Sequence, residues 1–288
     1  MYALHHIGGQ VTIAQLEKAR RFQALHARSG AFVIPNPWDA GTARILAGMG
    51  FEALTTTSAG LAFALGRRDG EGAVSLDETL SNARAIVAAT DLPVAADLEN
   101  GFGDAPEIAA RTIRMAGELA GVVGGSIEDA SGDPHHPIYD FGHAVERVAA
   151  SVEAARGLGF PFVFVARTEN YLHGRPDLDD TIRRLQAFER AGADALFAPG
   201  VTRADDIRTI CQAVTLPVNV VMGLKTASHT VAELAGLGVR RISIGSALSR
   251  AALGEFVRAA REIRDEGTFR FAESALPYAE ANDMMSER

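Results

Sequence analysis

The most restrictive feature of this sequence is a strict alternation of short apolar runs with segments of helical periodicity. The runs predict strands at residues 31–34, 53–57, 94–98, 124–127, 162–166, 195–198, 218–221 and 241–244. Helices are predicted at 12–29, 39–49, 75–89, 106–120, 142–156, 179–191, 204–213, 226–235 and 246–264. Eight strands in alternation with helices predict a (β/α)8 TIM barrel. The competing architecture, an open doubly wound sheet, usually has a glycine-rich turn after its first strand, where this chain has Pro35-Asn36-Pro37.

We expect the 288 residues to form one barrel domain. The barrel spans about residues 31–264, an extra helix precedes it, and a helical tail at 265–288 either covers it or reaches a neighbouring subunit. Between the second strand and the helix at 75–89, Ser58-Ala59-Gly60 is expected to open a loop that runs through Asp69.

Composition excludes several partners. The net charge of −8 and the pI near 5.5 argue against nucleic acid, which usually requires a basic face. No apolar run approaches the ~20 residues of a membrane span, and the amino-terminal residues lack the apolar segment of a signal peptide. The single cysteine, Cys211, excludes an internal disulfide framework and fits a reducing compartment. We therefore expect a cytoplasmic protein with no membrane partner.

Polar side chains gather where the predicted strands end. In a TIM barrel these carboxyl ends form the catalytic mouth. The opposite ends are mostly glycine, proline or apolar residues, so the polarity is one-sided. The polar ends hold Asn36, Thr57, Ser58, Asp97, Glu99, Glu128, Asp129, Arg167, Glu169, Asn170, Asn219 and Ser243. Among them Asn219 is a candidate for substrate binding.

Three of these residues suggest a metal site. Asp97 and Glu99 follow the third strand and Glu128 follows the fourth, so their carboxylates should converge at one edge. Ligation by oxygen alone, without His or Cys, suits Mg²⁺ or Mn²⁺. The alternative for the segment at Asp97 is a solvated loop with ordinary turn chemistry. Arg167, on the next strand, offers a fork that matches a carboxylate, and its alternative role is a structural ion pair with one of these acids.

The loop at 130–141 is long and follows the acids directly. It holds His135 and His136, either of which would act as an acid or base near neutral pH if the loop closes as a lid. The alternative is a solvent-exposed loop. A Schiff-base mechanism is disfavoured, because neither lysine, Lys18 or Lys225, falls on a predicted strand. The amides of Ile244-Gly245-Ser246 open the last barrel helix and are a weak candidate for anion binding.

At these residues the chain resembles the isocitrate lyase and phosphoenolpyruvate mutase superfamily, from about Phe32 to Leu253. The superfamily's D-x-D-x-G-x-G, E-D and A-R-T-[DE] segments and its strand-two serine-glycine segment are matched in the same order. The matching residues are Asp97 to Gly103, Glu128-Asp129, Ala166-Arg167-Thr168-Glu169 and Thr57-Ser58-Ala59-Gly60, together with Asp69 at the end of the next loop.

The resemblance implies a barrel whose last helix is exchanged between subunits, and thus a homo-oligomer, either a dimer or a tetramer. It implies Mg²⁺ held by Asp97, with Asp69, Glu99 and Glu128 acting through water. The carboxylate of an α-oxo acid would be held by backbone N–H groups of the segment Ser58, Ala59, Gly60 and Leu61. Bond cleavage beside the carbonyl leaves enolpyruvate-like charge, which the metal and Arg167 would stabilise.

Two departures narrow the reaction. The lyases carry K-[KR]-C-G-H in the gating loop, where this chain has neither cysteine nor lysine, and Pro199 stands where the superfamily has His or Glu. This argues against isocitrate or methylisocitrate cleavage. We predict a Mg²⁺-dependent carbon–carbon lyase or decarboxylase for a small α-oxo or 2-hydroxy carboxylate, with Arg167, Glu128, His135 and His136 as catalytic candidates. The alternatives are a phosphonate P–C mutase or hydrolase and a non-catalytic oxo-acid binder.

Overall fold

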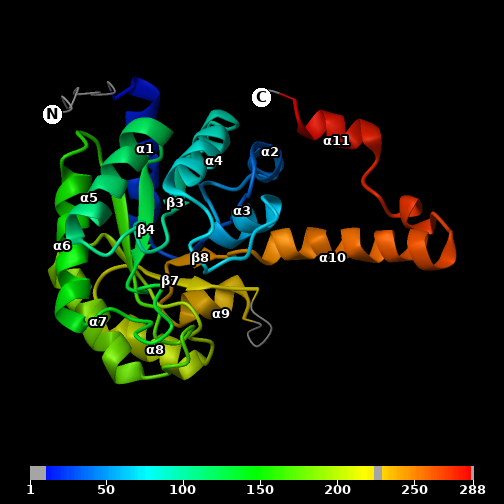
Figure 1. Cartoon of the computed structure of the whole chain (residues 1–288). Helices are drawn as coiled ribbons and strands as arrows, with labels where there is room; N and C mark the ends of the chain where they lie inside the picture. Colours follow the sequence, from blue (N-terminus) through cyan, green and yellow to red (C-terminus); the bar gives the residue numbers. More distant parts are fainter. Residues whose placement is uncertain (1–10, 224–228, 287–288) are drawn as a thin grey trace, which may run out of the picture.

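Eight parallel strands surround a common axis in the computed structural model, which describes residues 11–223 and 229–286 (Figure 1). Their order is β1-β8-β7-β6-β5-β4-β3-β2, and each neighbouring pair is parallel. A hydrogen bond from Thr55 N to Pro35 O (3.1 Å) links the two end strands. The predicted (β/α)8 barrel is therefore confirmed. The strands are β1 Phe32–Ile34, β2 Leu54–Thr55, β3 Val94–Asp97, β4 Gly124–Glu128, β5 Val163–Arg167, β6 Ala195–Phe197, β7 Val218–Val221 and β8 Arg241–Ser243.

Several helices begin at a residue whose side chain caps them. Asp39 and Thr42 form a reciprocal capping box at the start of α2. Thr12 caps α1 by accepting from Gln15 N at 3.0 Å. The α-helices are α1 Ile13–Ala27, α2 Ala40–Gly48, α3 Ser58–Ala64, α4 Leu76–Ala88, α5 Pro106–Met115, α6 Phe141–Arg156, α7 Leu178–Arg190, α8 Ala204–Ala213, α9 Val231–Gly236, α10 Ala247–Arg261 and α11 Tyr278–Met284. The part of the predicted 226–235 helix before residue 229 lies outside the described residues. No helix of the described chain is long and apolar enough to cross a membrane.

One prediction was wrong. The segment after β2 is not an open loop from Ser58 onward, because α3 begins there. Thr57 caps this helix by accepting from Gly60 N at 3.2 Å, and Leu61 is buried. A short helix thus separates β2 from the loop that holds Asp69.

Helix α1 closes the amino-terminal end of the barrel. A Cβ added to Gly124, the first residue of β4, would lie 2.6 Å from Cε1 of Phe22, so the aromatic ring of α1 rests directly against this strand. Phe22 is fully buried. The barrel is therefore sealed at this end, and its polar carboxyl end faces the opposite way.

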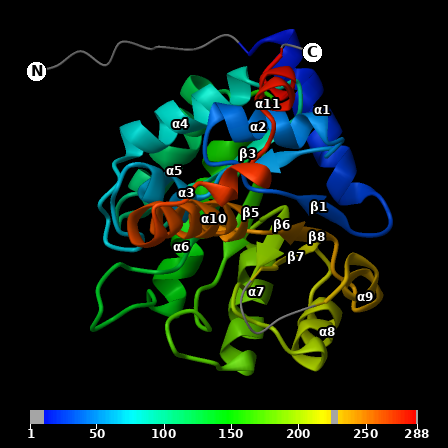
Figure 2. The ribbon, with the colours of Figure 1, turned by 90° about the vertical axis from the view of Figure 1, so that its right-hand side faces the viewer.

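Helix α10 extends away from the barrel (Figure 1), and Figure 2 looks towards its end. Its outer half carries exposed apolar side chains, among them Leu253, Phe256 and Val257. The tail after it is helical only in part, with a 3₁₀ turn at Arg270–Glu273 and the helix α11. It returns to α2, where Arg44 donates to the carbonyl of Met285 at 3.1 Å.

Candidate active site

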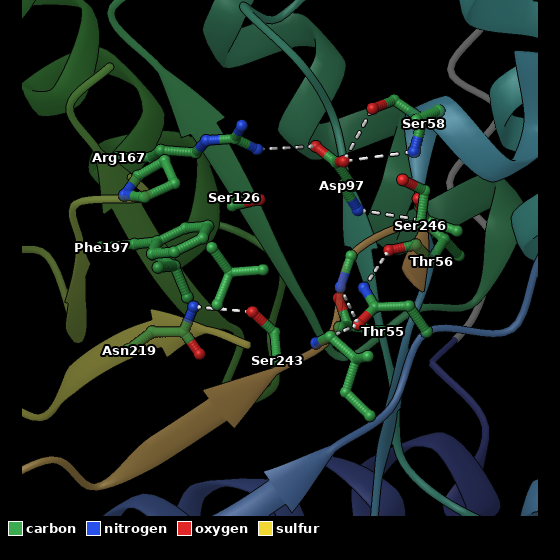
Figure 3. A pocket seen from close by; sticks show the side chains of 18 of the residues that line it. Thr55, Thr56, Ser58, Asp97, Ser126, Arg167, Phe197, Asn219, Ser243 and Ser246 are labelled. Atoms are coloured by element: carbon green, nitrogen blue, oxygen red, sulfur yellow. Dashed lines mark hydrogen bonds and ion pairs between the residues drawn. The ribbon is translucent and has the colours of Figure 1, made fainter. Parts of the chain in front are cut away.

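A cavity of about 270 Å³ opens at the carboxyl end of the strands and reaches into the barrel. Its wall contains residues from most of the strands and from the start of α3. Figure 3 shows Arg167 and Asp97 pointing toward each other on one side, while Asn219, Ser243 and Thr55 lie further along the wall. Seven of the twelve predicted polar strand-end residues line this cavity, namely Asn36, Thr57, Ser58, Asp97, Arg167, Asn219 and Ser243. The other five, Glu99, Glu128, Asp129, Glu169 and Asn170, do not line it.

The Asp97 carboxylate is held by three hydrogen bonds and one ion pair. Its Oδ2 accepts from the N–H and the hydroxyl of Ser58, at 3.2 and 2.9 Å. Its Oδ1 accepts from Glu99 N at 3.3 Å and lies 3.6 Å from a guanidinium nitrogen of Arg167. The hydroxyl of Thr56 accepts from the Asp97 backbone N–H at 2.9 Å. The carboxylate at the end of β3 therefore has a fixed orientation at the cavity wall.

Arg167 is the centre of charge in the site. Its guanidinium lies 3.2 Å from Glu128, contacts Asp97 and is hydrogen-bonded to Glu169. One face of the guanidinium covers the ring of Phe197, with the centroid 5.1 Å away. Burial alone would lower the pKa of Arg167, but the surrounding carboxylates outweigh it and raise that pKa. This arginine is a permanent cation at the cavity.

The remaining acids sit where negative charge is costly. Burial, together with the carboxylates of Asp97 and Asp69, raises the pKa of Glu99 to about 7. Burial and then Asp97 likewise raise the pKa of Asp69. Burial raises the pKa of Glu128 well above its usual range despite Arg167 beside it. The negative charge of these carboxylates, when all are ionised, thus exceeds the positive charge that Arg167 supplies beside them.

This donor set fits a divalent cation. The acids around Arg167 offer only oxygen ligands, which Mg²⁺ and Mn²⁺ prefer, and a cation would relieve their mutual repulsion. In the described part of the chain, no three Asp, Glu, His or Cys side chains come close enough together to hold an ion by themselves. Direct ligation by one carboxylate with water on the others is therefore the arrangement that suits these residues.

A buried network fixes the strand ends behind the site. Asp129 turns into the core, where Arg184 lies 3.1 Å from its carboxylate. The same carboxylate accepts from the hydroxyl of Thr168 (2.9 Å) and from Glu169 N (2.8 Å). Asp129 is thus a structural residue that positions Thr168 and Glu169, which directly follow β5.

The loop after β3 is held by a second arginine. Glu99 and Phe102 have φ of 48° and 61°, which non-glycine residues rarely adopt. Arg147 of α6 is 1% exposed and donates to the carbonyl groups of Asn100, Gly103 and Asp104. The unusual backbone that orients Glu99 is therefore stabilised from outside the loop.

The family model described as phosphoenolpyruvate phosphomutase matches residues 22–264. The chain belongs to this family. A solved structure from Burkholderia cenocepacia J2315, described as a lyase/mutase, is 57% identical, with a TM-score of 0.93 over 96% of this chain and 98% of the other.

Two further family relatives carry named activities. The oxaloacetate decarboxylase of a Bradyrhizobium strain is 32% identical over 72% of this chain and 70% of its own length. The crystal structure of 2,3-dimethylmalate lyase is 26% identical, with a TM-score of 0.83 over 93% of this chain and 95% of the other.

The family's serine-glycine segment is only partly available to a ligand. Ser58 and Ala59 line the cavity, but the N–H and the hydroxyl of Ser58 both donate to Asp97. The N–H groups of Gly60 and Leu61 already donate to Thr57, to its hydroxyl at 3.2 Å and its carbonyl at 3.1 Å. The predicted anion binding by the amides of Ile244 and Gly245 is wrong for the same reason. Both N–H groups donate to Asn36 Oδ1 at 2.9 Å and do not face an anion.

The loop histidines lie apart from the acids. His135 and His136 are exposed, and neither lines the cavity. Their loop is closed on itself by Ser131 N to Pro137 O (2.9 Å) and by the Ala130–Ile138 bridge. Their catalytic role stays a prediction that requires this loop to move.

The remaining residues that the sequence analysis singled out lie partly at the cavity and partly far from it. Asn219 lines the cavity from β7, and Pro199 lines it from the segment after β6. Lys18 lies on α1 and donates to Thr90 O, while Lys225 lies outside the described residues. Burial raises the pKa of Cys211, on α8, to about 11, so this thiol is inert.

Phe197 and Arg241 are among the cavity residues that the sequence analysis missed. Phe197 reads as an ordinary apolar strand residue, and nothing local indicates its contact with Arg167. Arg241 begins β8, two positions before the polar Ser243. Residues two positions apart on a strand lie on the same face, so Arg241 and Ser243 face the same way. This alternation predicts that the Arg241 side chain points into the barrel.

Proposed function

We propose that this protein is a Mg²⁺-dependent lyase, with Mn²⁺ as a substitute, that cleaves or decarboxylates a small α-oxo or 2-hydroxy carboxylate through an enolpyruvate-like intermediate. The observation that carries this proposal is the position of Arg167 at a cavity wall among several acids, within 3.6 Å of Asp97. Two family relatives are named for this kind of bond cleavage, an oxaloacetate decarboxylase and a 2,3-dimethylmalate lyase.

In this proposal Asp97 holds the metal ion, and Asp69, Glu99 and Glu128 hold its waters. When bound, the ion acts as a Lewis acid on the substrate's carbonyl oxygen. The surplus of buried carboxylates over guanidinium groups supports this assignment.

The chain's own residues then bind and orient the acid. Ala59, at the start of α3, faces the cavity and suits the substrate carboxylate, while Ser58 uses both its N–H and its hydroxyl group to hold Asp97. Arg167 is a permanent cation that neutralises the charge developing beside the carbonyl. Asn219 supplies a further polar contact from β7. Glu128 orients Arg167 through their 3.2 Å ion pair.

His135 or His136 is the proposed proton donor to the enolate carbon. Alanine variants test each one singly and together. We expect the double variant to lose turnover by at least about tenfold, since a positioned acid contributes 10²- to 10⁴-fold, while oxalate affinity is retained. Unchanged turnover in the double variant would remove both histidines from the mechanism.

The primary experiment is a calorimetric titration with oxalate, which resembles the pyruvate enolate, with and without Mg²⁺. We expect binding that requires Mg²⁺ and disappears in Asp97→Ala. Ser126→Ala is the matched control, because Ser126 lines the same cavity and has no hydrogen bond to Asp97 in the described structure. The absence of oxalate binding in the wild-type protein would refute the proposal.

Phosphonate chemistry is the second candidate, and the family model that matches the chain favours it. It uses the same acids and Arg167, so only substrates separate the two. Turnover of phosphonopyruvate in preference to oxaloacetate and 2-methylisocitrate would select the P–C reaction. Oxalate affinity without turnover of any of these would select a non-catalytic binder.

We further propose that the protein is a cytoplasmic homo-oligomer, a dimer or tetramer in which α10 is exchanged between subunits. The exposed apolar side chains on the outer half of α10 support this, because a projecting helix of this kind gains stability when a second copy covers it.

A further inference from the structure

Four inward-facing residues form one row across neighbouring strands. Arg167 pairs in register with Phe197, Phe197 with Asn219, and Asn219 with Arg241. Residues in register on parallel strands point to the same side of the sheet, and all four line the cavity. Arg167 is the last residue of β5, whereas Arg241 is the first residue of β8. The row therefore runs from the mouth of the barrel into its interior and has an arginine at each end.

The two arginines differ in their partners. Arg167 contacts three carboxylates. Arg241 is 4% exposed, and no aspartate or glutamate of the described chain forms an ion pair with it. Its contacts are Nε2 of His26, 3.3 Å from its NH1 group, and the ring of Phe22, 5.7 Å from its Cζ. Burial lowers the pKa of Arg241 to about 10, so the side chain is still a cation at neutral pH.

The inner end of the cavity also has unsatisfied polar atoms. Four buried side-chain atoms lack a hydrogen-bond partner within the described residues, and two of them are Arg241 Nε and Asn219 Oδ1. The Asn219 amide donates to Ser243 Oγ at 3.0 Å. Rotation of that amide would let Ser243 donate to its oxygen and turn its N–H group toward the cavity. Both residues can thus present N–H donors to one acceptor.

A buried cation without a counterion costs free energy that packing does not recover. Because the cavity extends to Arg241, a ligand that enters from the mouth can supply the missing negative charge. A carboxylate matches the two-nitrogen fork of a guanidinium group. A ligand held at Asp97 and Arg167 by its oxo-acid end would have to be longer than oxalate to reach this depth.

From this geometry we propose that the inner end of the cavity, at Arg241 and Asn219, is a second carboxylate subsite, and that the substrate is a linear dicarboxylate that spans the row from Arg167 to Arg241. This inference rests on the proposed function, because it takes the oxo-acid end of the ligand to lie at Asp97.

The test uses pairs of 2-oxo acids with the same chain length that differ only in whether they end in a carboxylate or a methyl group. The pairs are oxaloacetate with 2-oxobutyrate, 2-oxoglutarate with 2-oxovalerate, and 2-oxoadipate with 2-oxohexanoate. Their affinities are measured by displacement of oxalate in the presence of Mg²⁺. In the wild-type protein we expect at least one dicarboxylate to bind at least about tenfold more tightly than the methyl-ended acid of the same length. This factor is the affinity that one charge-assisted contact with Arg241 would add.

Arg241→Met should abolish this preference and leave oxalate affinity unchanged, whereas Arg241→Lys, which keeps the charge, should retain part of it. The melting temperature of the ligand-free Arg241→Met protein should stay the same or rise, since an unpaired buried cation is removed. A purely structural arginine would give a lower melting temperature and no change in the preference.

Oxalate binding without a preference in any pair would overturn the subsite and leave the proposed function intact. Equal weakening of oxalate and the dicarboxylates in Arg241→Met would also overturn it, because Arg241 would then act on the outer site. Failure of the wild-type protein to bind oxalate would remove both proposals.

Discussion

Ser58 donates both its N–H and its hydroxyl hydrogen to the same oxygen of Asp97, at 3.2 and 2.9 Å. The other Asp97 oxygen is left to face Arg167 at 3.6 Å. The two donors belong to the first residue of α3, whose N-terminus favours negative charge. The element that the sequence analysis read as a loop is therefore the support that orients the proposed metal ligand.

Loss of the Ser58 hydroxyl should weaken metal binding. Ser58→Ala keeps the backbone N–H bond but removes the shorter hydrogen bond to Asp97. We expect Mg²⁺ affinity to fall by roughly tenfold, the low end of the effect of residues that orient a metal ligand. Calorimetric titration with Mg²⁺ measures this, with Ser126→Ala as the control from the same cavity. Equal affinities in the wild type and Ser58→Ala would show that the hydroxyl does not orient Asp97.

Arg147 should contribute to both stability and metal binding. Arg147→Met leaves the carbonyl groups of Asn100, Gly103 and Asp104 without their buried donor. We expect the free energy of unfolding to fall by about 3 kcal/mol, given the cost of unsatisfied buried polar groups. Urea denaturation measures this change. We also expect weaker Mg²⁺ binding, because the backbone at Glu99 loses its support. Arg111→Met, at an exposed position of α5, should change neither quantity.

His26 makes the stability depend on pH. It is packed edge-on between Phe22 and Phe32, with ring centroids 4.7 and 5.1 Å away. Because Arg241 can only donate to its Nε2, Nδ1 carries the hydrogen and donates to Phe22 O at 2.8 Å. The imidazole is therefore neutral in the folded protein. Burial, with help from Arg241, lowers the pKa of His26 to about 3.

Between this pKa and the ordinary value near 6.5, the unfolded chain binds a proton at His26 that the folded protein does not. The contribution of the neutral His26 to the free energy of unfolding is fully present above about pH 6.5. It decreases as the pH falls toward 3, by up to about 1.4 kcal/mol per pH unit. We expect the stability difference between the wild type and His26→Asn to shrink from pH 7 to pH 4 in urea titrations. A constant difference for His26→Asn would mean that His26 has the same pKa in the folded and the unfolded protein, which contradicts the prediction.

The strands could be predicted because each buried parallel strand is an uninterrupted apolar run. Val94–Asp97 shows this, since its apolar residues are buried from both sides and only its last residue is polar. The convergence of Asp97 and Glu128 on Arg167 followed from the same rule, because the carboxyl ends of neighbouring parallel strands meet at one edge.

The features that were missed depend on contacts distant in sequence. Ser58-Ala59-Gly60 contains typical turn residues, and α3 forms because Thr57 caps it and Leu61 is buried against the rest of the protein. Arg241 was overlooked since a charged residue at a strand start usually faces solvent. Its inward direction follows from its register with Asn219.

The last prediction concerns the projecting helix α10. Phe256 is 69% exposed and lies beside Leu253 and Val257, which are 42% and 40% exposed. Burial of a phenylalanine side chain stabilises an interface by roughly 2 kcal/mol or more. In an obligate interface between copies, each subunit would bury its own Phe256 in this way. We expect light scattering to give a dimer or tetramer for the wild type and a smaller species for Phe256→Glu.

Arg111→Glu controls for the change of charge, because Arg111 lies on α5, on the barrel. It should keep the wild-type oligomeric state. The Phe256→Glu protein should also lose thermal stability, since α10 no longer gains packing from a second copy. If the wild type is monomeric at micromolar concentration, the exposed apolar residues of α10 do not form a stable interface between copies of this chain, and helix exchange is excluded.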